Sequence, residues 1–153
     1  MSDQRGLYTD EIDDFLVDIA SFKGAFPCDQ IPVFSDNEYS IIINVDNSNL
    51  SGSHWTALTI RGNRGYYFDS FGRLYDNASF PIDYIESLSK LCRSKKMVFQ
   101  NKVLQSFHSN TCGEYCIYFI KKLEDRVNFS DIFHDFTENL NSNDIKIMNL
   151  FKK

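Results

Sequence analysis

The feature that most constrains this chain is a polar loop that turns into an apolar helical pattern at a cysteine. The stretch reads Gln105-Ser106-Phe107-His108-Ser109-Asn110-Thr111-Cys112-Gly113-Glu114-Tyr115-Cys116. Beyond it, large apolar residues recur at the spacing of one buried helical face, at Tyr115, Cys116, Phe119, Ile120 and Leu123. The pattern predicts a core helix with Cys112 as its first or second residue. Unpaired N–H groups and the helix dipole favour a thiolate there, so Cys112 can be made nucleophilic.

The composition is that of a folded domain. The 153 residues are 42% hydrophobic and include 14 Phe and 8 Tyr, which excludes a disordered chain. We therefore expect a single domain over residues 1–153, long enough to bury a core. The formal net charge of -5 gives no general basic field for nucleic acid.

The sequence also predicts a cellular setting. No basic, apolar and small-residue series marks a signal peptide, and no apolar run reaches membrane-spanning length. We expect an intracellular protein that is not secreted and has no membrane partner. In that compartment the four cysteines, Cys28, Cys92, Cys112 and Cys116, are expected to be reduced.

The first half of the chain predicts one helix and three strands. Thr9 is the predicted cap of a helix, with Ile12, Phe15, Leu16 and Ile19 facing inward. Two prolines and a glycine in residues 24–32 predict an extended loop without regular structure. Strands are predicted over residues 40–45, 54–60 and 66–69, with a turn at residues 61–65.

The last two of these strands form a predicted antiparallel hairpin. Its geometry brings the start of the first strand and the end of the second to one edge, where His54 and Asp69 lie. The register is undetermined by a residue or two, so the sequence allows contact between them without showing it.

The second half predicts further helices around one more strand. A helix opened by Pro81 has Ile82, Ile85, Leu88 and Cys92 inward, and residues 96–104 form a strand with Met97, Phe99 and Val103 buried. The tail reads as two amphipathic helices, the first with Ile132, Phe133, Phe136 and Leu140 inward and the second with Ile145, Met148 and Phe151 inward.

A nucleophilic thiol needs an imidazole base, and the base needs an acceptor to orient it. Of the three histidines, His54 stands at a strand edge beside the carboxylate of Asp69, whereas His108 lies in a loop and His134 on a tail helix. We predict His54 as the base and Asp69 as its partner. Gln105, seven residues before Cys112, can return its amide to the nucleophile and join the Cys112 N–H as an oxyanion donor.

Four pieces of the sequence together resemble a known enzyme family. They are His54-Trp55, Tyr67-Phe68-Asp69-Ser70-Phe71-Gly72, Gln105-Ser106 and Thr111-Cys112-Gly113. Their order and spacing closely resemble the adenovirus-protease-like (adenain-like) cysteine proteases, which are related to the proteases of ubiquitin-like modifiers. Residues 26–32, Phe-Pro-Cys-Asp-Gln-Ile-Pro, resemble the versions found in DNA viruses and virus-like DNA transposons.

The resemblance implies an α+β, permuted papain-like fold with a mixed sheet flanked by helices. It implies Cys112 as nucleophile, His54 as general base, Asp69 as its partner and Gln105 as oxyanion donor. Trp55 would stack near the site, and Gly113 would let the helix backbone approach the substrate. The implied activity is peptide hydrolysis through a thioester, after small residues such as Gly, in capsid or core precursor proteins. The implied location is the host cytoplasm or nucleus, with packaging into the virion.

The chain also departs from the adenovirus enzyme, which is basic, has glutamate in place of Asp69, and is activated by DNA and by a disulfide-tethered peptide. This chain is acidic, and Cys92 is only the nearest cysteine to the tether position. We expect a monomer that needs no cofactor for its chemistry and acts on polypeptide substrates. A peptide or DNA activator follows from the resemblance alone, and the net charge does not favour DNA.

Other interpretations of the same residues stay open. Cys112 and Cys116 taken alone are ordinary core residues, and His108, Cys112 and Cys116 at four-residue spacing form a weak zinc pattern without the usual Cys-x₂-Cys pair. A protease that removes a ubiquitin-like modifier, or an acetyltransferase effector, would use the same triad. A catalytically silent binding module is the third hypothesis, and the complete set of His54, Asp69, Gln105 and Cys112 argues against it.

Overall fold

A five-stranded mixed sheet forms the centre of the computed structural model, which describes residues 6–50 and 52–151. The strands, in spatial order, are β1 (Phe22–Pro27), β2 (Glu38–Asn44), β3 (Trp55–Arg61), β4 (Arg64–Phe68) and β5 (Lys96–Phe99). The central pairs β2–β3 and β3–β4 are antiparallel, and the edge strands β1 and β5 run parallel to their neighbours. The expected α+β class with a mixed sheet is confirmed.

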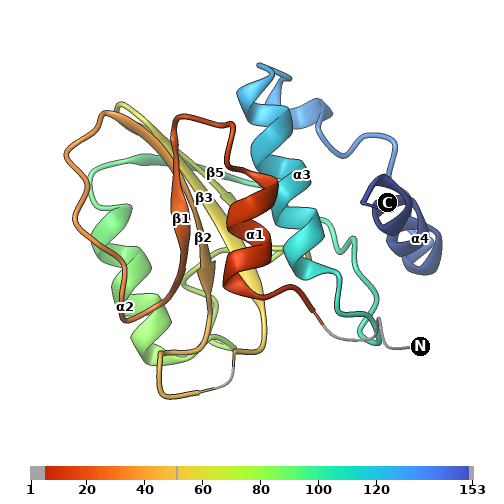
Figure 1. Cartoon of the computed structure of the whole chain (residues 1–153), viewed down its shortest axis with the longest axis horizontal. Coiled ribbons are helices and arrows are strands. Elements are labelled where there is room, and N and C mark those ends of the chain that lie inside the picture. The colour runs from red at the N-terminus through yellow and green to blue at the C-terminus, as the bar shows by residue number, and fades with distance from the viewer. Residues whose placement is uncertain (1–5, 51, 152–153) are drawn as a thin grey trace.

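Helices cover both faces of this sheet (Figure 1). They are α1 (Thr9–Phe15), α2 (Ile82–Leu91), α3 (Cys112–Glu124) and α4 (Leu140–Leu150), with a short 3₁₀ turn, η2 (Phe129–Asp131). α1 and α3 lie on one face and α2 on the other, while α4 lies beyond α3, away from the sheet (Figure 1). In the described part of the chain, no helix combines the length and apolar character that crossing a membrane requires.

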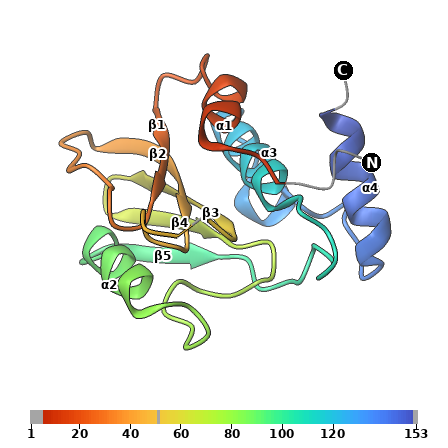
Figure 2. The same cartoon turned by 60° about the horizontal axis from the view of Figure 1, so that its bottom comes forward.

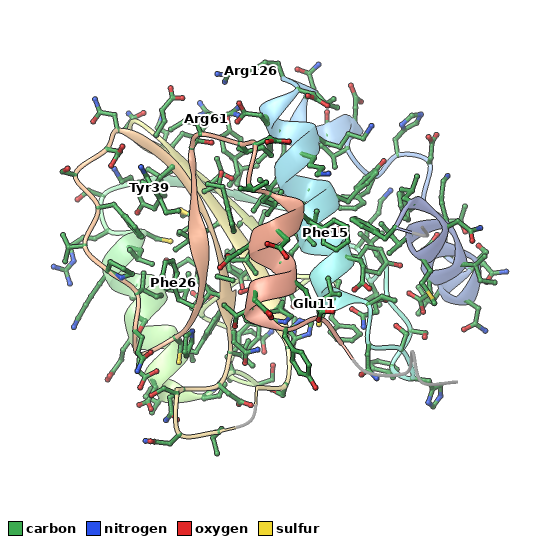
Figure 3. All side chains as sticks on the ribbon, in the orientation of Figure 1. Glu11, Phe15, Phe26, Tyr39, Arg61 and Arg126 are labelled. Carbon is green, nitrogen blue, oxygen red and sulfur yellow. The ribbon has the colours of Figure 1, made fainter. Side chains whose placement is uncertain are left out.

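Alternation along the strands builds a core on each face of the sheet. Ile42, Ala57 and Phe68 face α1 and α3. The residues next to them, including Ile41, Ile43, Leu58 and Tyr67, face α2. Figure 3 shows Phe26 and Tyr39 on the α2 side and Phe15 on the α1 side.

The predicted hairpin is confirmed, and its register brings the expected residues together. β3 and β4 pair from Ala57 opposite Phe68 to Arg61 opposite Arg64, and a two-residue turn over residues 62–63 joins them. Gly62 in this turn has a φ of 61°, as a tight hairpin turn requires. The pairing places His54 and Asp69 at the same end of the sheet, where β3 begins and β4 ends.

Two of the predicted loop and strand boundaries are wrong. Within residues 24–32, predicted to lack regular structure, the chain up to Pro27 belongs to strand β1. An edge strand tolerates Pro27 at its end and an irregularity between Phe22 and Gly24, and local sequence signals do not show such pairing. The strand predicted over residues 96–104 ends at Phe99, because the chain then leaves the sheet toward Ser70.

The buried residues expected on that last strand are also partly wrong. Phe99 is 37% exposed and Val103 is 43% exposed, whereas Met97 is partly buried against the α2 core. Val103 is exposed because it lies in the loop after β5, where no helix covers it.

The first two helices differ from prediction at their ends. α1 ends at Phe15 rather than near Ile19, and its N-cap is Tyr8 rather than Thr9. In α2, Pro81 is the N-cap, as expected of a helix opened by proline, but Ile82 is 67% exposed. Tyr84 takes the inward position instead, which leaves Leu88 and the C-cap Cys92 buried as predicted.

The tail has one α-helix where two were predicted. Ile132, Phe133 and Phe136 are buried as expected, but they sit in turns after η2. In α4 the inward face carries Asn143, Asp144 and Ile147. Ile145 and Met148, predicted inward, are 60% and 46% exposed, because α4 turns a polar face toward the loop before α3.

Candidate active site

The predicted site residues gather at the end of the sheet where β3 begins and β4 ends. That end of the sheet lies at the bottom of Figure 1 and comes forward in Figure 2. Three segments meet there: the β2–β3 loop, the loop after β4, and residues 100–111 leading into α3. His54 comes from the first, Asp69 from the second, and Gln105 and Cys112 from the third. The topology therefore unites residues that lie up to 58 positions apart in the chain (112 − 54).

Cys112 is the first residue of α3, as predicted, with Thr111 as N-cap. The thiol is 6% exposed, and its Sγ accepts a hydrogen bond from the backbone N–H of Trp55 at 3.4 Å. The backbone N–H of Cys112 belongs to the first turn of the helix, where N–H groups have no intrahelical acceptor. The sulfur thus lies beside two sources of positive potential, a helix N-terminus and a strand amide.

His54 links Cys112 to Asp69. Its Nε2 lies 2.5 Å from Asp69 Oδ1, and the contact is shielded, since the histidine side chain is 11% exposed and that of Asp69 is fully buried. His54 and Cys112 line the same hollow, and Cys112 lies close enough to raise the pKa of the His54 ring. Phe71 stacks on the face of the His54 ring, with the two centroids 5.1 Å apart.

The protonated form of His54 and the ionised form of Asp69 stabilise each other. Burial lowers the pKa of His54, but the hydrogen bond to Asp69 and the neighbouring Cys112 outweigh burial and raise that pKa to about 9. Burial raises the pKa of Asp69, but hydrogen bonds from His54 and Arg73 hold it below its ordinary value. The arrangement therefore favours a protonated imidazole beside an ionised carboxylate at neutral pH.

Arg73 is a member of the site that the sequence did not reveal. Its Nε donates to Asp69 Oδ2 at 2.6 Å, and its backbone N–H donates to the same oxygen at 3.2 Å. The guanidinium lies over the ring of Phe80, 4.3 Å from the centroid. The only sequence signal is the four-residue spacing from Asp69, which carries little information in a loop. Arg73 leaves Asp69 Oδ1 to His54 and occupies Oδ2.

Gln105 is held by Ser70, the residue after Asp69. The Ser70 hydroxyl donates to Gln105 Oε1 at 2.6 Å, and Gln105 Nε2 donates to the Ser109 carbonyl at 2.9 Å. An amide nitrogen carries two hydrogens, so one N–H of Gln105 remains for another acceptor. Gln105 and Cys112 line the same hollow. The geometry agrees with the predicted oxyanion donor, whose role in catalysis stays a prediction.

Trp55 and Gly113 lie against each other behind the nucleophile. The Trp55 indole Nε1 donates to the Leu7 carbonyl at 3.0 Å. A Cβ on Gly113 would lie 3.3 Å from the Leu7 side chain and 3.4 Å from Trp55 Cδ1. Gly113 therefore lets the N-terminal segment and Trp55 pack close to the first turn of α3. Its predicted use, close approach of the substrate, stays a prediction.

A second glycine joins two of the site loops. Gly72 has a φ of 76°, and a Cβ there would lie 2.7 Å from the Lys102 carbonyl oxygen. Both facts require glycine. The contact holds the loop that carries Asp69 against the segment that leads to Gln105.

The loop before Cys112 is anchored from α4, which sequence reasoning also missed. Asp144 is 6% exposed, and its carboxylate accepts from the hydroxyls of Ser106, Thr111 and Tyr115, at 2.7, 3.4 and 2.9 Å. The backbone N–H of Ser106 donates to it at 3.3 Å. One carboxylate thus binds both ends of the segment from Ser106 to Thr111. An acidic residue on a tail helix carries no sequence signal of that contact.

Two hollows meet at Cys112. The Trp55 hollow, of about 580 Å³, is lined by the N-terminal segment at residues 6–9, by loop residues 46–48, and by Trp55. The His54 hollow, of about 690 Å³, is lined by His54, Gln105 and aromatic residues. Both include Cys112, Ser53, Asp46 and Asn110. They form a path past the sulfur with a different lining on each side.

The remaining cysteines are buried away from this path. Burial raises the pKa of Cys28 to about 11 and that of Cys92 to about 12. Cys116 is fully buried on the underside of α3, which raises its pKa well above the ordinary value. Cys116 is therefore core, as the helical pattern indicated.

The weak zinc pattern is not supported. Among residues 6–50 and 52–151, no three histidine, cysteine or acidic side chains are grouped so as to hold a metal ion. His108 is exposed, while Cys116 faces the core. His134, the third histidine, is exposed in the tail beside Asp135.

Comparison with known proteins identifies relatives by fold and none by sequence. No family model matches the chain, and no curated protein matches it. The crystal structure of the ASFV pS273R protease aligns with a TM-score of 0.60 at 19% identity, over 98% of this chain and 68% of that one. A selenomethionine crystal structure of the same protease gives a TM-score of 0.56 at 20% identity, over 97% and 69% of the two chains.

A third structure is more distant. ChlaDub1 from Chlamydia trachomatis aligns with a TM-score of 0.45 at 14% identity, over 98% of this chain and 78% of that one. The likeness to the ASFV protease is one of fold, and it confirms the expected papain-like α+β architecture.

Proposed function

We propose that this chain is a cysteine endopeptidase that uses Cys112 as nucleophile, His54 as general base and acid, and Asp69 to orient His54. The observation that carries the proposal is His54, hydrogen-bonded to Asp69 and lining one hollow with a cysteine at a helix N-terminus. The likeness in fold to the ASFV pS273R protease supports it.

The first half of the proposed reaction forms a thioester. The Cys112 thiolate attacks the carbonyl carbon of the scissile bond, and the carbonyl π electrons move to the oxygen. The Cys112 backbone N–H and the free N–H of Gln105 Nε2 stabilise this oxyanion. As the tetrahedral intermediate collapses, the C–N bond breaks and His54 gives its proton to the leaving amine.

The second half returns the enzyme to its starting state. Water attacks the thioester carbon while His54 takes one of its protons, and the C–S bond breaks to release the carboxylic acid. Asp69 stays ionised throughout and keeps the imidazole in one orientation. Arg73 supports this role by holding Asp69 from its other oxygen. The proposed chemistry draws on side chains and water and requires no cofactor.

We propose viral or transposon precursor polypeptides as the substrates, cut after small residues such as Gly. This part rests on the resemblance to the adenovirus-protease-like enzymes carried by the four sequence pieces. The same resemblance supports a location in the cytoplasm or nucleus of an infected cell, with the enzyme packaged into virions. The Trp55 hollow, with its polar walls, suits an extended peptide backbone with small side chains.

Removal of a ubiquitin-like modifier is the alternative, because it breaks a Gly-Gly amide by the same chemistry. The two functions differ only in the leaving group, which is a peptide α-amine in one and a lysine ε-amine in the other. A matched pair of substrates, with one Gly-Gly acyl part and either a peptide or an isopeptide bond, separates them.

The test of the proposal is hydrolysis of a Gly-Gly-X peptide by the wild-type chain and by Cys112→Ala. We expect cleavage by the wild type, none by the variant, and nearly the same Tm for both, because the substitution removes one sulfur at the site. Equal cleavage by the variant would refute Cys112 as nucleophile. Cleavage of the isopeptide in place of the peptide would favour the modifier protease.

A further inference from the structure

The proposed function, on which this inference rests, determines the direction in which a substrate lies across Cys112. The leaving amine must receive its proton from His54, so the part of the substrate that leaves lies on the His54 side of Cys112. His54 lines the His54 hollow and does not line the Trp55 hollow. The leaving half of a substrate therefore occupies the His54 hollow, and the acyl half occupies the Trp55 hollow.

The His54 hollow has an aromatic wall that begins at the catalytic ring. Phe71 stacks on His54, and Phe107 stacks on Phe71, with ring centroids 5.5 Å apart and planes 15° apart. Phe107 lies in the short loop between Gln105 and Cys112. Its position relative to the reacting atoms is thus controlled by the same loop that carries the proposed oxyanion donor.

Phe107 is 81% exposed, which is unusual for a phenylalanine held in a stack. Val103, in the segment before it, is 43% exposed and lines the same hollow. Phe80 and Pro81 complete the apolar lining on the other side. Clustered apolar side chains at the mouth of a cleft mark a site where an apolar ligand group is removed from water.

The arginine of this hollow is already engaged. The Arg73 guanidinium is bound to Asp69 and lies over Phe80, so it strengthens the aromatic wall and is not directed at a ligand carboxylate. The Trp55 hollow differs, since its lining includes Asn44, Asn47 and Ser48 and has none of the phenylalanines of the His54 hollow. The two halves of the cleft therefore select by different chemistry.

We propose that Phe107, with Phe71 behind it, is a specificity-determining residue for the leaving half of the substrate. It selects an apolar or aromatic side chain in the first residue after the scissile bond. The ring of Phe107 provides a face on which that side chain packs as the amide approaches Cys112. Phe107 thus adds a preference for the residue after the scissile bond. Before the bond, small residues are expected.

The test compares peptides that share one acyl half ending in Gly-Gly and differ in the next residue: Phe, Leu, Ser or Asp. We expect kcat/KM of the wild type to be roughly tenfold higher for Phe and Leu than for Ser and Asp, the range in which an apolar contact discriminates substrates. Phe107→Ala should cut the four peptides at similar rates. Phe107→Tyr should retain the preference, because it keeps the ring face.

Two controls separate this inference from the proposed function. A Gly-Gly peptide nitrile carries only the acyl half, so it should bind Phe107→Ala as it binds the wild type. Val33, which is 98% exposed and lines neither hollow, supplies a matched variant, Val33→Ala, that should keep the wild-type preference.

The outcomes are distinct. A wild type that neither binds the nitrile nor cuts any peptide refutes the proposed function. A wild type that cuts all four peptides equally, or a Phe107→Ala variant that keeps the preference, refutes the specificity role of Phe107 and leaves the protease proposal standing.

Discussion

The carboxylate of Asp144 in α4 accepts a hydrogen bond from the Ser106 hydroxyl at 2.7 Å, although the two residues lie 38 positions apart. The same carboxylate accepts from Thr111 and Tyr115, so the tail helix holds the loop that ends at Cys112. The position of the nucleophile's loop thus depends on a residue well outside the four pieces that carry the family resemblance.

The first prediction concerns this anchor. Asp144→Asn replaces one acceptor oxygen by a donor, which leaves a buried donor of the loop unsatisfied and should lower stability by about 1–3 kcal/mol. Because the loop also positions Gln105, kcat for a Gly-Gly-X peptide should fall while the protein is still folded. Urea unfolding and kinetics at a temperature well below Tm measure the two effects.

Ile145, the next residue in α4, supplies the control, since its side chain is 60% exposed. Ile145→Ala should leave both stability and kcat near wild type. A wild-type kcat in folded Asp144→Asn would show that α4 stabilises the fold without positioning the loop.

The second prediction concerns the four cysteines. Burial raises the pKa of Cys28 to about 11, that of Cys92 to about 12, and that of Cys116 well above its ordinary value. Cys112 instead faces His54 and the Trp55 N–H and borders both hollows. A peptide vinyl sulfone at neutral pH should therefore modify Cys112 alone in the native protein, and iodoacetamide in denaturant should modify all four. Mass mapping that finds label on native Cys28 or Cys92 would overturn the assignment.

Much of this architecture can be predicted from local patterns. The hairpin that unites His54 and Asp69 has strong alternation and a glycine turn, and α3 has an uninterrupted apolar face from Tyr115 to Leu123. In both cases the signal lies in neighbouring residues of the chain. The end of the sheet at which the β3–β4 hairpin and α3 meet is therefore predictable from the sequence.

The features that were missed depend on partners distant in the chain or on the backbone. Strand β1 exists because β2 is beside it, and Asp144 is buried because it meets three hydroxyls of another segment. The contact of Arg73 with Asp69 arises in a loop, where side-chain spacing has no fixed direction. The Trp55 N–H that reaches Cys112 Sγ is a main-chain group, which no residue type can indicate.

The third prediction is a pH profile. The pKa of His54 is about 9, above its unfolded value of 6.5, so protonated His54 stabilises the fold fully below pH 6.5 and loses this contribution as pH rises through about 9. The proposed mechanism needs that proton for the leaving amine, so kcat/KM should fall on an alkaline limb near pH 9. Asp69→Asn removes the carboxylate charge that raises the pKa of His54 and should move the limb to lower pH, with a loss of activity of orders of magnitude. An alkaline limb of kcat/KM at the wild-type pH in folded Asp69→Asn would show that Asp69 does not raise the pKa of His54.

The fourth prediction tests Arg73 as the partner of Asp69. Arg73→Met removes a hydrogen bond between charged groups and should destabilise the protein by about 1.5–3 kcal/mol. It should also raise the pKa of Asp69. Ionised Asp69 stabilises the fold above its unfolded pKa of 3.8, and this contribution is lost as pH falls through the lower folded pKa. Acid unfolding of the variant, followed by circular dichroism, should therefore begin at higher pH. Arg64→Met, at an exposed arginine, is the control, and the same midpoint for both variants would contradict the role.

The fifth prediction concerns Glu114, in the first turn of α3. Its Oε1 is buried and, within the described residues, has no hydrogen-bond partner. Burial, with a smaller contribution from Glu11, raises the pKa of Glu114 to about 7 from 4.5. Since the folded pKa lies above the unfolded one, ionisation costs stability, and the cost grows as pH rises from about 4.5 to 7.

Glu114→Gln removes the charge and keeps the shape of the side chain. Its advantage over the wild type should therefore be absent near pH 4.5 and reach about 1–3 kcal/mol at pH 8. Urea unfolding at the two pH values measures it, and Glu138→Gln, at an exposed glutamate, should show no such pH dependence. A difference between Glu114→Gln and the wild type that stays constant with pH would show that the side chain is hydrated in solution and that its ionisation costs the fold nothing.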